Sequence, residues 1–212
     1  MQSSVYAVAV GDDVVFLDVG RDRYLCWPSV AGLRVCASGD ALEIQDASLL
    51  GDLRAAGLVR RGPPDAPRAP TVSIAPPACD LARDPGAQRH DLQAMARAAF
   101  DAAVTYQRND FAQLVAFGRR HEGPSPDVAP PPKMRAMVRG FQTWAPWLPA
   151  PAKCLIRSFT LLRLLRRGGF DARWVFAVRT WPFEAHCWLQ AGDVVLDDEL
   201  ERLVAFHPIL VV

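Results

Sequence analysis

Residues 154–179, with the sequence CLIRSFTLLRLLRRGGFDARWVFAVR, decide the fold of the second half of this 212-residue chain. Apolar side chains recur every three or four residues in the first part, which predicts one helix from Cys154 through Arg167. The Gly168-Gly169 pair is a helix-ending signal, and the apolar run over 172–178 predicts a strand. The local order is therefore helix, turn, strand.

The stretch that follows, EAHCWLQAGDVVLDD at 184–198, predicts two more strands. Apolar residues fill 185–189 and 194–196, and turn residues around Gly192 separate the two runs. Because the connections are short, we expect these strands to be antiparallel neighbours in one sheet with the strand over 172–178.

Two segments upstream of this sheet have helical periodicity, one over 90–117 and one around Met134 to Phe141. A proline cluster at 124–132 separates them. Together with the predicted helix and strands downstream, they indicate an α+β domain in which helices pack on an antiparallel sheet.

The first 62 residues predict a separate small module that begins with a three-stranded sheet. Turn residues separate three apolar runs, at 5–10, 14–17 and 24–27. With the helices that follow, the module has a small core of marginal stability. We expect a module of this kind to bind another molecule.

Helical spacing follows the predicted sheet in three segments. The first covers Val30 to Val35, and the second carries Leu42 and Ile44. Asp46 is a suitable N-cap for the third, which ends at Gly57. The module is thus predicted to combine three strands with three helices.

Proline composition divides the chain. Residues 62–86 hold seven of the eighteen prolines and lack a periodic apolar pattern, as is typical of a semi-rigid linker. The sequence therefore predicts a module over 1–62, a linker over 63–86 and a larger domain over 87–212.

The overall composition is that of a globular protein, with 50% hydrophobic residues, 22% charged residues and a net charge of +1. This near-neutral balance gives no reason to expect nucleic acid or an anionic membrane as a partner. No apolar stretch reaches the roughly 18 residues of a membrane span, and the first residues lack the basic start of a signal peptide. We expect a cytoplasmic protein.

The chain has five cysteines, an odd number that does not suit a disulfide framework. No pair has the CxxC spacing of zinc and redox sites, and no glycine-rich phosphate loop occurs. We therefore expect no metal and no other cofactor. The cysteines are Cys26, Cys36, Cys79, Cys154 and Cys187.

One of these thiols has the setting of a nucleophile. Cys154 begins a predicted helix, and a helix N-terminus stabilises a thiolate and offers backbone N–H groups to an oxyanion. His186 lies within the predicted strand over 185–189, and Asp198 follows the predicted strand over 194–196. Neighbouring strands place the imidazole beside the carboxylate, so the pattern predicts a Cys-His-Asp triad.

Two rivals share this region. Cys187 is a second thiol, but as the strand neighbour of His186 it should point to the opposite face of the sheet. Asp197 competes with Asp198, and strand parity does not decide between them because the strand ends there. Each of these residues alone is more often structural than catalytic, and only the ordered spacing favours catalysis.

The chain resembles the transglutaminase-like cysteine protease of lasso peptide biosynthesis, the B protein. The resemblance rests on Cys-Leu-Ile-Arg-Ser at 154–158, Ala-His-Cys-Trp at 185–188 and Val-Leu-Asp-Asp at 195–198. It is strong over residues 150–212 and loose over residues 90–145. It implies a transglutaminase-like or papain-like domain, with the family aspartate at Asp198. Gln190 stands where the family often has glutamate.

The resemblance also gives the first 62 residues a role. They are similar to the recognition element that captures the leader of a ribosomally made precursor peptide as an added strand. The implied peptide-binding residues lie on the third strand and on the facing helix: Tyr24, Leu25, Cys26, Trp27, Leu49 and Leu53. The bland alternative is that these apolar residues form the core of the module.

The resemblance implies a leader peptidase with two partners, the precursor peptide and an ATP-dependent macrolactam synthetase. In this peptidase Cys154 attacks, His186 transfers protons and the helix start near Leu155 contributes to the oxyanion hole. Two other functions fit the same residues: a transglutaminase-type acyltransferase that uses an amine in place of water, and a peptide-binding scaffold without activity.

Overall fold

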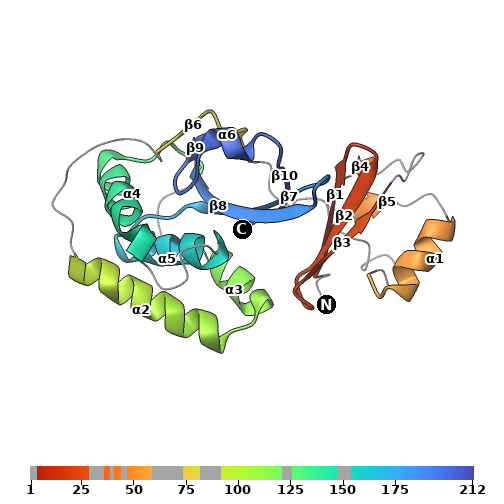
Figure 1. Cartoon of the computed structure of the whole chain (residues 1–212), viewed down its shortest axis with the longest axis horizontal. Coiled ribbons are helices and arrows are strands. Elements are labelled where there is room, and N and C mark those ends of the chain that lie inside the picture. Colours follow the sequence, from red (N-terminus) through yellow and green to blue (C-terminus); the bar gives the residue numbers. More distant parts are fainter. Residues whose placement is uncertain are drawn as a thin grey trace. The chain divides into compact units, whose positions relative to one another are not determined.

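The computed structural model describes residues 4–28, 36–38, 41–43, 47–58, 74–81, 92–120, 126–147 and 154–212. Figure 1 shows its helices and strands. The chain divides into two compact units. The first consists of residues 1–73, 177–185 and 207–211, and the second of residues 74–176 and 186–206 with Val212.

The first unit contains the predicted three-stranded sheet. Its strands are β1 (Val5–Val10), β2 (Asp13–Asp18) and β3 (Arg23–Trp27), antiparallel and in the order β1-β2-β3. This confirms the three strands predicted from the apolar runs. Every residue of β2 is buried, because this strand lies in the middle of the sheet and both of its faces are covered. β3 is at an edge of the sheet.

One face of this sheet forms a small apolar core with the helix that follows it. Phe16 of β2 and Leu53 of α1 (Ala47–Ala55) are almost completely buried in it, and Leu25 and Trp27 of β3 pack against it. On the other face, Tyr24 contacts Phe183, with the ring centroids 6.1 Å apart. Side chains of β3 thus alternate between the two faces, as a strand requires.

The helices predicted for this module are only partly found. The last one is α1, and it ends as predicted: Gly57 has a φ of +71°, and the Leu58 N–H bonds the Leu53 carbonyl. Leu42, predicted to be helical, lies instead in β5 (Ala41–Glu43), which pairs with β4 (Cys36–Ser38). The Val30–Val35 segment, Ile44 and Asp46 lie outside the described residues.

The correction at Leu42 has a physical reason. The two strands are antiparallel, with Ser38 opposite Ala41, so only Gly39-Asp40 stand between them in the sequence. A Gly-Asp pair between two short runs is a signal for a β-hairpin. The apolar spacing of Leu42 and Ile44 is two residues, which suits a strand at least as well as a helix.

The second unit supplies the helices that surround the site. They are α2 (Leu92–Arg108), α3 (Phe111–Gly118), α4 (Pro132–Trp144), the 3₁₀ turn η2 (Ala145–Trp147), α5 (Cys154–Arg167) and the short α6 (Leu200–Leu203). The helices predicted around 134–141 and from Cys154 through Arg167 are confirmed. The single helix predicted over 90–117 is wrong, because the chain forms two helices there.

The break between α2 and α3 is built by a capping box. Asp110 accepts a hydrogen bond from the Gln113 backbone N–H at 2.8 Å, and the Gln113 side chain accepts one from the Asp110 N–H at 2.9 Å. These reciprocal bonds start a new helix. Asp110 with Gln113 three residues later is the sequence signal that the prediction missed.

The predicted antiparallel strands belong to a five-stranded sheet in the order β10-β7-β8-β9-β6. Its strands are β6 (Cys79–Asp80), β7 (Arg173–Arg179), β8 (Glu184–Ala191), β9 (Val194–Val195) and β10 (His207–Val211). β8 and β9 are antiparallel neighbours. Figure 1 shows α5 running alongside β8, an arrangement that brings the start of the helix to the sheet.

Part of the predicted linker over 63–86 is an ordered part of this sheet. β6 runs parallel to β9, with the Ala78 N–H bonded to the Asp193 carbonyl at 2.8 Å. Asp80 accepts the Leu200 N–H at the start of α6 at 2.9 Å. The second compact unit of the structure includes these residues, from Ile74 on. The domain limits over 1–62 and 87–212 stay a prediction.

The far end of α5 is anchored by one arginine. Arg166 is buried, pairs with Asp171 at 3.0 Å and donates hydrogen bonds to the carbonyls of Phe117 and Gly118 at 2.7 and 2.8 Å. A buried guanidinium needs such partners for its N–H groups. The bonds fix α5 to the end of α3, so the start of α5 has a defined position.

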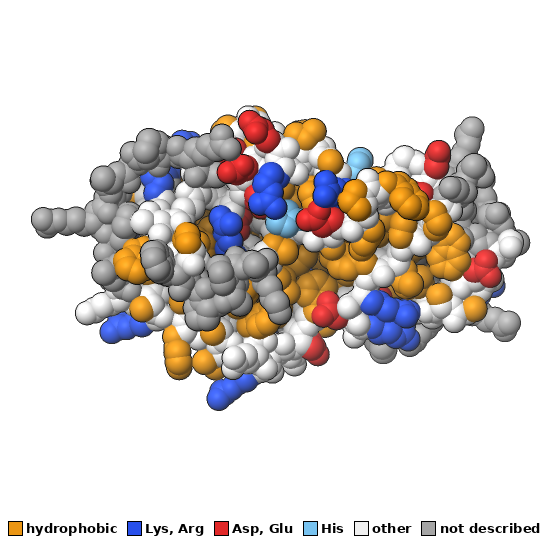
Figure 2. All heavy atoms as spheres, in the orientation of Figure 1, with side chains coloured by type: hydrophobic (Ala, Val, Ile, Leu, Met, Phe, Trp, Pro, Cys, Tyr) orange, Lys and Arg blue, Asp and Glu red, His pale blue; other side chains and the backbone are white. Residues whose placement is uncertain are grey.

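The described surface carries charges of both signs. Acidic and basic side chains are interspersed on the face drawn in Figure 2. Among the described residues, no helix has the length and apolar character needed to cross a membrane.

Candidate active site

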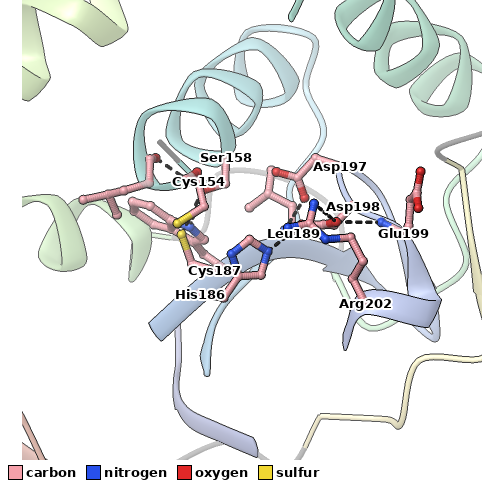
Figure 3. A network of polar contacts seen from close by, with 11 residues as sticks. Cys154, Ser158, His186, Cys187, Leu189, Asp197, Asp198, Glu199 and Arg202 are labelled. Atoms are coloured by element: carbon pink, nitrogen blue, oxygen red, sulfur yellow. Dashed lines mark hydrogen bonds and ion pairs between the residues drawn. The ribbon is translucent and has the colours of Figure 1, made fainter. Parts of the chain in front are cut away.

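The structure brings together the three side chains that the sequence pattern singles out. Cys154 opens α5, His186 lies on β8, and Asp198 follows β9. His186 Nε2 lies 2.5 Å from Asp198 Oδ2. Figure 3 shows the imidazole between the Cys154 sulfur and the Asp198 carboxylate. This group of three residues is called the Cys-His-Asp cluster below.

Asp198 is held as an anion. Burial works to raise its pKa, but the hydrogen bonds from His186 and from the Glu199 N–H, the latter at 2.8 Å, lower the pKa below its usual value. Arg202 lies 3.5 Å from the second carboxylate oxygen and adds to this effect. An ionised carboxylate accepts from Nε2–H and leaves Nδ1 of the imidazole to the thiol.

His186 favours the protonated form. Burial works against the imidazolium, but hydrogen bonds and charge from Asp198 and Cys154 raise its pKa to about 9. Its ring lies 5.4 Å from the ring of Phe206 and 6.4 Å from that of Trp188, centroid to centroid. These aromatic neighbours limit the access of water and hold the ring in place.

Cys154 favours the thiolate. A hydrogen bond from the Cys187 thiol lowers the pKa of Cys154, and the hydrogen bond and charge of His186 lower it further. Burial acts in the opposite direction, and the resulting pKa is about 4. The Cys154 residue is half-buried. Between pH 4 and 9 the cluster is therefore a thiolate–imidazolium pair, which is the reactive form of a cysteine nucleophile.

The two neighbouring aspartates have different partners. Asp197 does not contact the imidazole through a hydrogen bond; its Oδ1 accepts the Leu189 N–H at 2.7 Å. Burial raises the pKa of Asp197 to about 7, despite the charge of Arg157. Asp198 is thus the carboxylate beside His186, and Asp197 ties β8 to the loop after β9.

Cys187 is closer to the cluster than the sequence predicted. It was expected on the face of the sheet opposite to His186 and therefore away from the site. Instead its thiol lies beside the Cys154 sulfur, and its Sγ is 3.4 Å from Ser158 Oγ. Since Ser158 belongs to α5, this contact places α5 against the Cys187 side of β8.

Sequence reasoning missed Ser158 and Trp174. Ser158 is fully buried, donates to the Cys154 carbonyl at 2.8 Å and accepts from Trp174 Nε1 at 2.9 Å. The signal was available for Ser158, since residues four apart lie on the same helix face and Ser158 is four residues after Cys154. Nothing local in the sequence links Trp174 to the site.

The residues implied for peptide binding occupy two kinds of position. Cys26 is exposed, and Tyr24, Leu25 and Trp27 are half-buried on the edge strand β3. Leu53 is completely buried beneath β3, as a core residue. The side chain of Leu49 lies outside the described residues.

A profile of the Transglutaminase-like superfamily matches residues 96–211, which is more than half of the chain. The chain belongs to the transglutaminase-like superfamily. The match spans the whole Cys-His-Asp cluster, so the α+β class and the family expected for this domain are confirmed. Among the described residues of this superfamily member, no three His, Cys, Asp or Glu side chains are grouped to hold a metal ion.

A curated relative narrows the comparison. The Microcin J25-processing protein McjB of Escherichia coli is 42% identical over 45 residues, which cover 21% of this transglutaminase-like chain and 22% of McjB. This similarity supports the resemblance to the lasso peptide B proteins. The matched stretch is about a fifth of the relative's length. No solved structure matches the chain.

Proposed function

We propose that this protein is a leader peptidase of lasso peptide biosynthesis. The observation that carries the proposal is the thiolate–imidazolium pair of Cys154 and His186. Asp198 orients the imidazole, with its Oδ2 2.5 Å from His186 Nε2. The similarity to a microcin-processing protein supports a processed peptide as the substrate.

The cluster accounts for each step of peptide hydrolysis. The Cys154 thiolate attacks the scissile carbonyl, and backbone N–H groups near Leu155 at the start of α5 stabilise the oxyanion. The His186 imidazolium gives its proton to the leaving amine, which leaves a thioester on Cys154. His186 then takes a proton from water, the hydroxide attacks the thioester, and the acid and the thiolate are released. Asp198 keeps Nε2 protonated and Nδ1 directed at the thiol.

Leader binding belongs to the first module in this proposal. A leader segment adds beside β3, an edge strand among the described strands, where main-chain hydrogen bonds give affinity and side chains give selectivity. Tyr24, Leu25, Cys26 and Trp27 contact it, while Leu53 supports Leu25 and Trp27 from the core. Leu49, which belongs to α1, is the remaining residue that we assign to leader binding. This is the role of a RiPP recognition element.

The partners follow from the same chemistry. The substrate is a precursor peptide with leader and core, and the freed core passes to an ATP-dependent macrolactam synthetase. ATP and a newly made precursor are both found in the cytoplasm, where we place this protein. The product of the pathway is a lasso peptide of the antibiotic class.

The test is a mass-spectrometric cleavage assay with a precursor peptide from the same genome, run with and without the synthetase. We expect wild-type protein to release leader and core, and Cys154→Ala to release neither while it binds the labelled leader as tightly. Adding a free amine separates hydrolysis from acyl transfer, since a transglutaminase-type reaction gives an amide product of higher mass. Leader binding without any cleavage by wild type would favour the scaffold and contradict the proposal.

A further inference from the structure

The Cys-His-Asp cluster has a fourth neighbour whose role the triad chemistry does not explain. The sulfur atoms of Cys154 and Cys187 lie next to each other in Figure 3. They differ in their surroundings: Cys154 is half-buried, whereas Cys187 has only 4% of its surface exposed. Cys187 is therefore shielded from substrate but in contact with the nucleophile.

The proton of this thiol pair resides on Cys187. Burial, the neighbouring Cys154 and the charge of Asp197 raise the pKa of Cys187 well above its usual value, so it stays a thiol where Cys154 is a thiolate. His186 stabilises negative charge on Cys154 from the other direction. A thiol in contact with a thiolate has one favourable arrangement, in which S–H donates to S⁻.

Ser158 adjoins the Cys187 thiol in the interior. Trp174 Nε1–H donates to Ser158 Oγ at 2.9 Å, the Ser158 hydroxyl donates to the Cys154 carbonyl at 2.8 Å, and Ser158 Oγ lies 3.4 Å from Cys187 Sγ. Because the one hydroxyl proton of Ser158 is used on the carbonyl, Ser158 offers the Cys187 S–H only a neutral acceptor. The Cys154 thiolate is a charged acceptor and makes the stronger bond with that S–H. Ser158, Trp174 and Cys187 are all buried.

We propose that Cys187 is a positioning residue for the nucleophile, whose buried thiol donates a hydrogen bond to the Cys154 sulfur and holds it toward His186. The Cys187 backbone N–H donates to the same sulfur and reinforces its position. The thiolate is thus held by donors on two sides, and its direction does not depend on His186 alone. The effect of Cys187 on peptide cleavage rests on the proposed function, whereas its hydrogen bond to Cys154 does not.

The experiment measures the thiolate directly and needs no peptide. The rate of iodoacetamide alkylation of Cys154 is followed by mass mapping from pH 3 to 9 in the full chain. For wild type we expect the alkylation rate of Cys154 to reach half of its maximum near pH 4. In Cys187→Val this midpoint should move up by about 1–2 pH units, because the thiolate loses one charge-assisted hydrogen bond. Cys187→Ser keeps a donor, so its midpoint should lie between the two.

The controls separate hydrogen bonding from packing. Cys79→Ala removes an exposed thiol and should leave the midpoint unchanged. Circular dichroism and thermal melts check the fold of each variant. If Cys187→Val does not fold, Cys187→Ala carries the test, because it also removes the donor, adds no branched side chain and must raise the midpoint. A valine variant with the wild-type midpoint, or equal midpoints for the serine and valine variants, would overturn the proposal.

A cleavage assay adds the catalytic readout. With a leader-containing precursor peptide as substrate, the pH at which kcat/KM falls on the acid side should be higher for Cys187→Val by the same number of pH units. KM should stay unchanged. Because alkylation involves no substrate, a failure of the leader peptidase proposal would leave the alkylation result intact, and the two outcomes remain distinguishable.

Discussion

The Cys-His-Asp cluster and the N-terminal sheet of β1, β2 and β3 use buried carboxylates in opposite ways. Asp18 in the sheet is almost fully buried, and it accepts the backbone N–H groups of Gly20 and Arg21 at 3.1 and 3.2 Å. Its partners are the turn that it closes. Asp198 is equally buried, but its partner is a titratable ring that in turn contacts a thiol. The hydrogen-bond partner of a buried carboxylate, and not its burial, therefore indicates whether the carboxylate has a structural or a chemical role.

The two regions also differ in what their apolar residues do. In α5, the helix that begins with Cys154, apolar side chains such as Phe159 and Leu162 are fully buried and serve only the core. In the N-terminal sheet, Leu25 and Trp27 pack on the core and also belong to β3, which is an edge strand among the described strands. A residue that serves both core and surface cannot be assigned to binding from its type alone. The predictions below test this contrast.

The largest effect should come from the carboxylate beside His186. We expect Asp198→Asn to keep the fold and to lower kcat by roughly 10⁴, because the imidazole loses the anion that fixes its tautomer. Asp197→Asn is the matched control, since this side chain bonds the Leu189 N–H and not the ring. Leader cleavage by mass spectrometry measures both variants. The reverse ranking would move the catalytic role to Asp197.

A smaller effect should follow from removing the N-terminal sheet. A chain that starts at residue 74 keeps β6 in its place beside β9. We expect it to lose leader affinity and to cleave only at high peptide concentration, with kcat/KM lower by about 10²-fold or more. Fluorescence polarisation with labelled leader gives the affinity.

A second truncation refines the first one. A chain that starts at residue 82 lacks β6 and should also unfold at a lower temperature, because its hydrogen bonds to Asp193 and Leu200 are gone. If the chain from residue 74 binds leader as tightly as wild type, the N-terminal sheet is not the recognition element.

The pH profile should show the ion pair of the cluster. Below about pH 4 the Cys154 thiolate is protonated, and above about pH 9 His186 has no proton for the leaving amine. The plot of kcat/KM should therefore be bell-shaped with these limits and fall about tenfold per unit outside them. In Asp198→Asn the upper limit should move down, since Asp198 helps to hold the proton on His186. An unchanged upper limit would mean that Asp198 does not act through the ring.

The smallest effect concerns stability and not catalysis. The pKa of Asp197 is raised to about 7 in the folded protein from 3.8, so the folded state holds the extra proton between these values. Stability from this group is therefore lost as pH rises from 4 to 7. Between pH 5 and 7 the free energy of unfolding should fall by about 2–3 kcal/mol more in wild type than in Asp197→Asn. Urea unfolding at both pH values measures the difference, and parallel curves would contradict it.

Much of the site was predictable because its polar residues occur in a fixed order on the predicted helix and strands. Cys154 at a helix start, His186 on a strand and Asp198 after the next strand follow from local patterns that each have few interpretations. The place of Cys187 could not be predicted from strand alternation. Alternation gives the face of the sheet on which a side chain lies, but it does not say which face the helix covers.

The fold was less predictable where short signals compete. The strands of the N-terminal sheet have long apolar runs, and all three were found. Leu42 has apolar neighbours at a spacing that fits either a helix or a strand, and the choice depends on the partner strand Cys36–Ser38. The ordered path of Ile74–Leu81 depends on hydrogen bonds to residues more than a hundred positions away, such as Gln190 to the Ala75 carbonyl. Composition alone does not reveal such bonds.

The attachment of β6 has a mechanical consequence. Residues 74–81 include β6 of the five-stranded sheet, and they are bonded to Asp193, Val195 and Leu200. Those three residues bracket the loop that carries Asp197 and Asp198. The path of residues 74–81 is therefore coupled by hydrogen bonds to the backbone on both sides of the two aspartates, whereas α5, which carries Cys154, is held by Arg166.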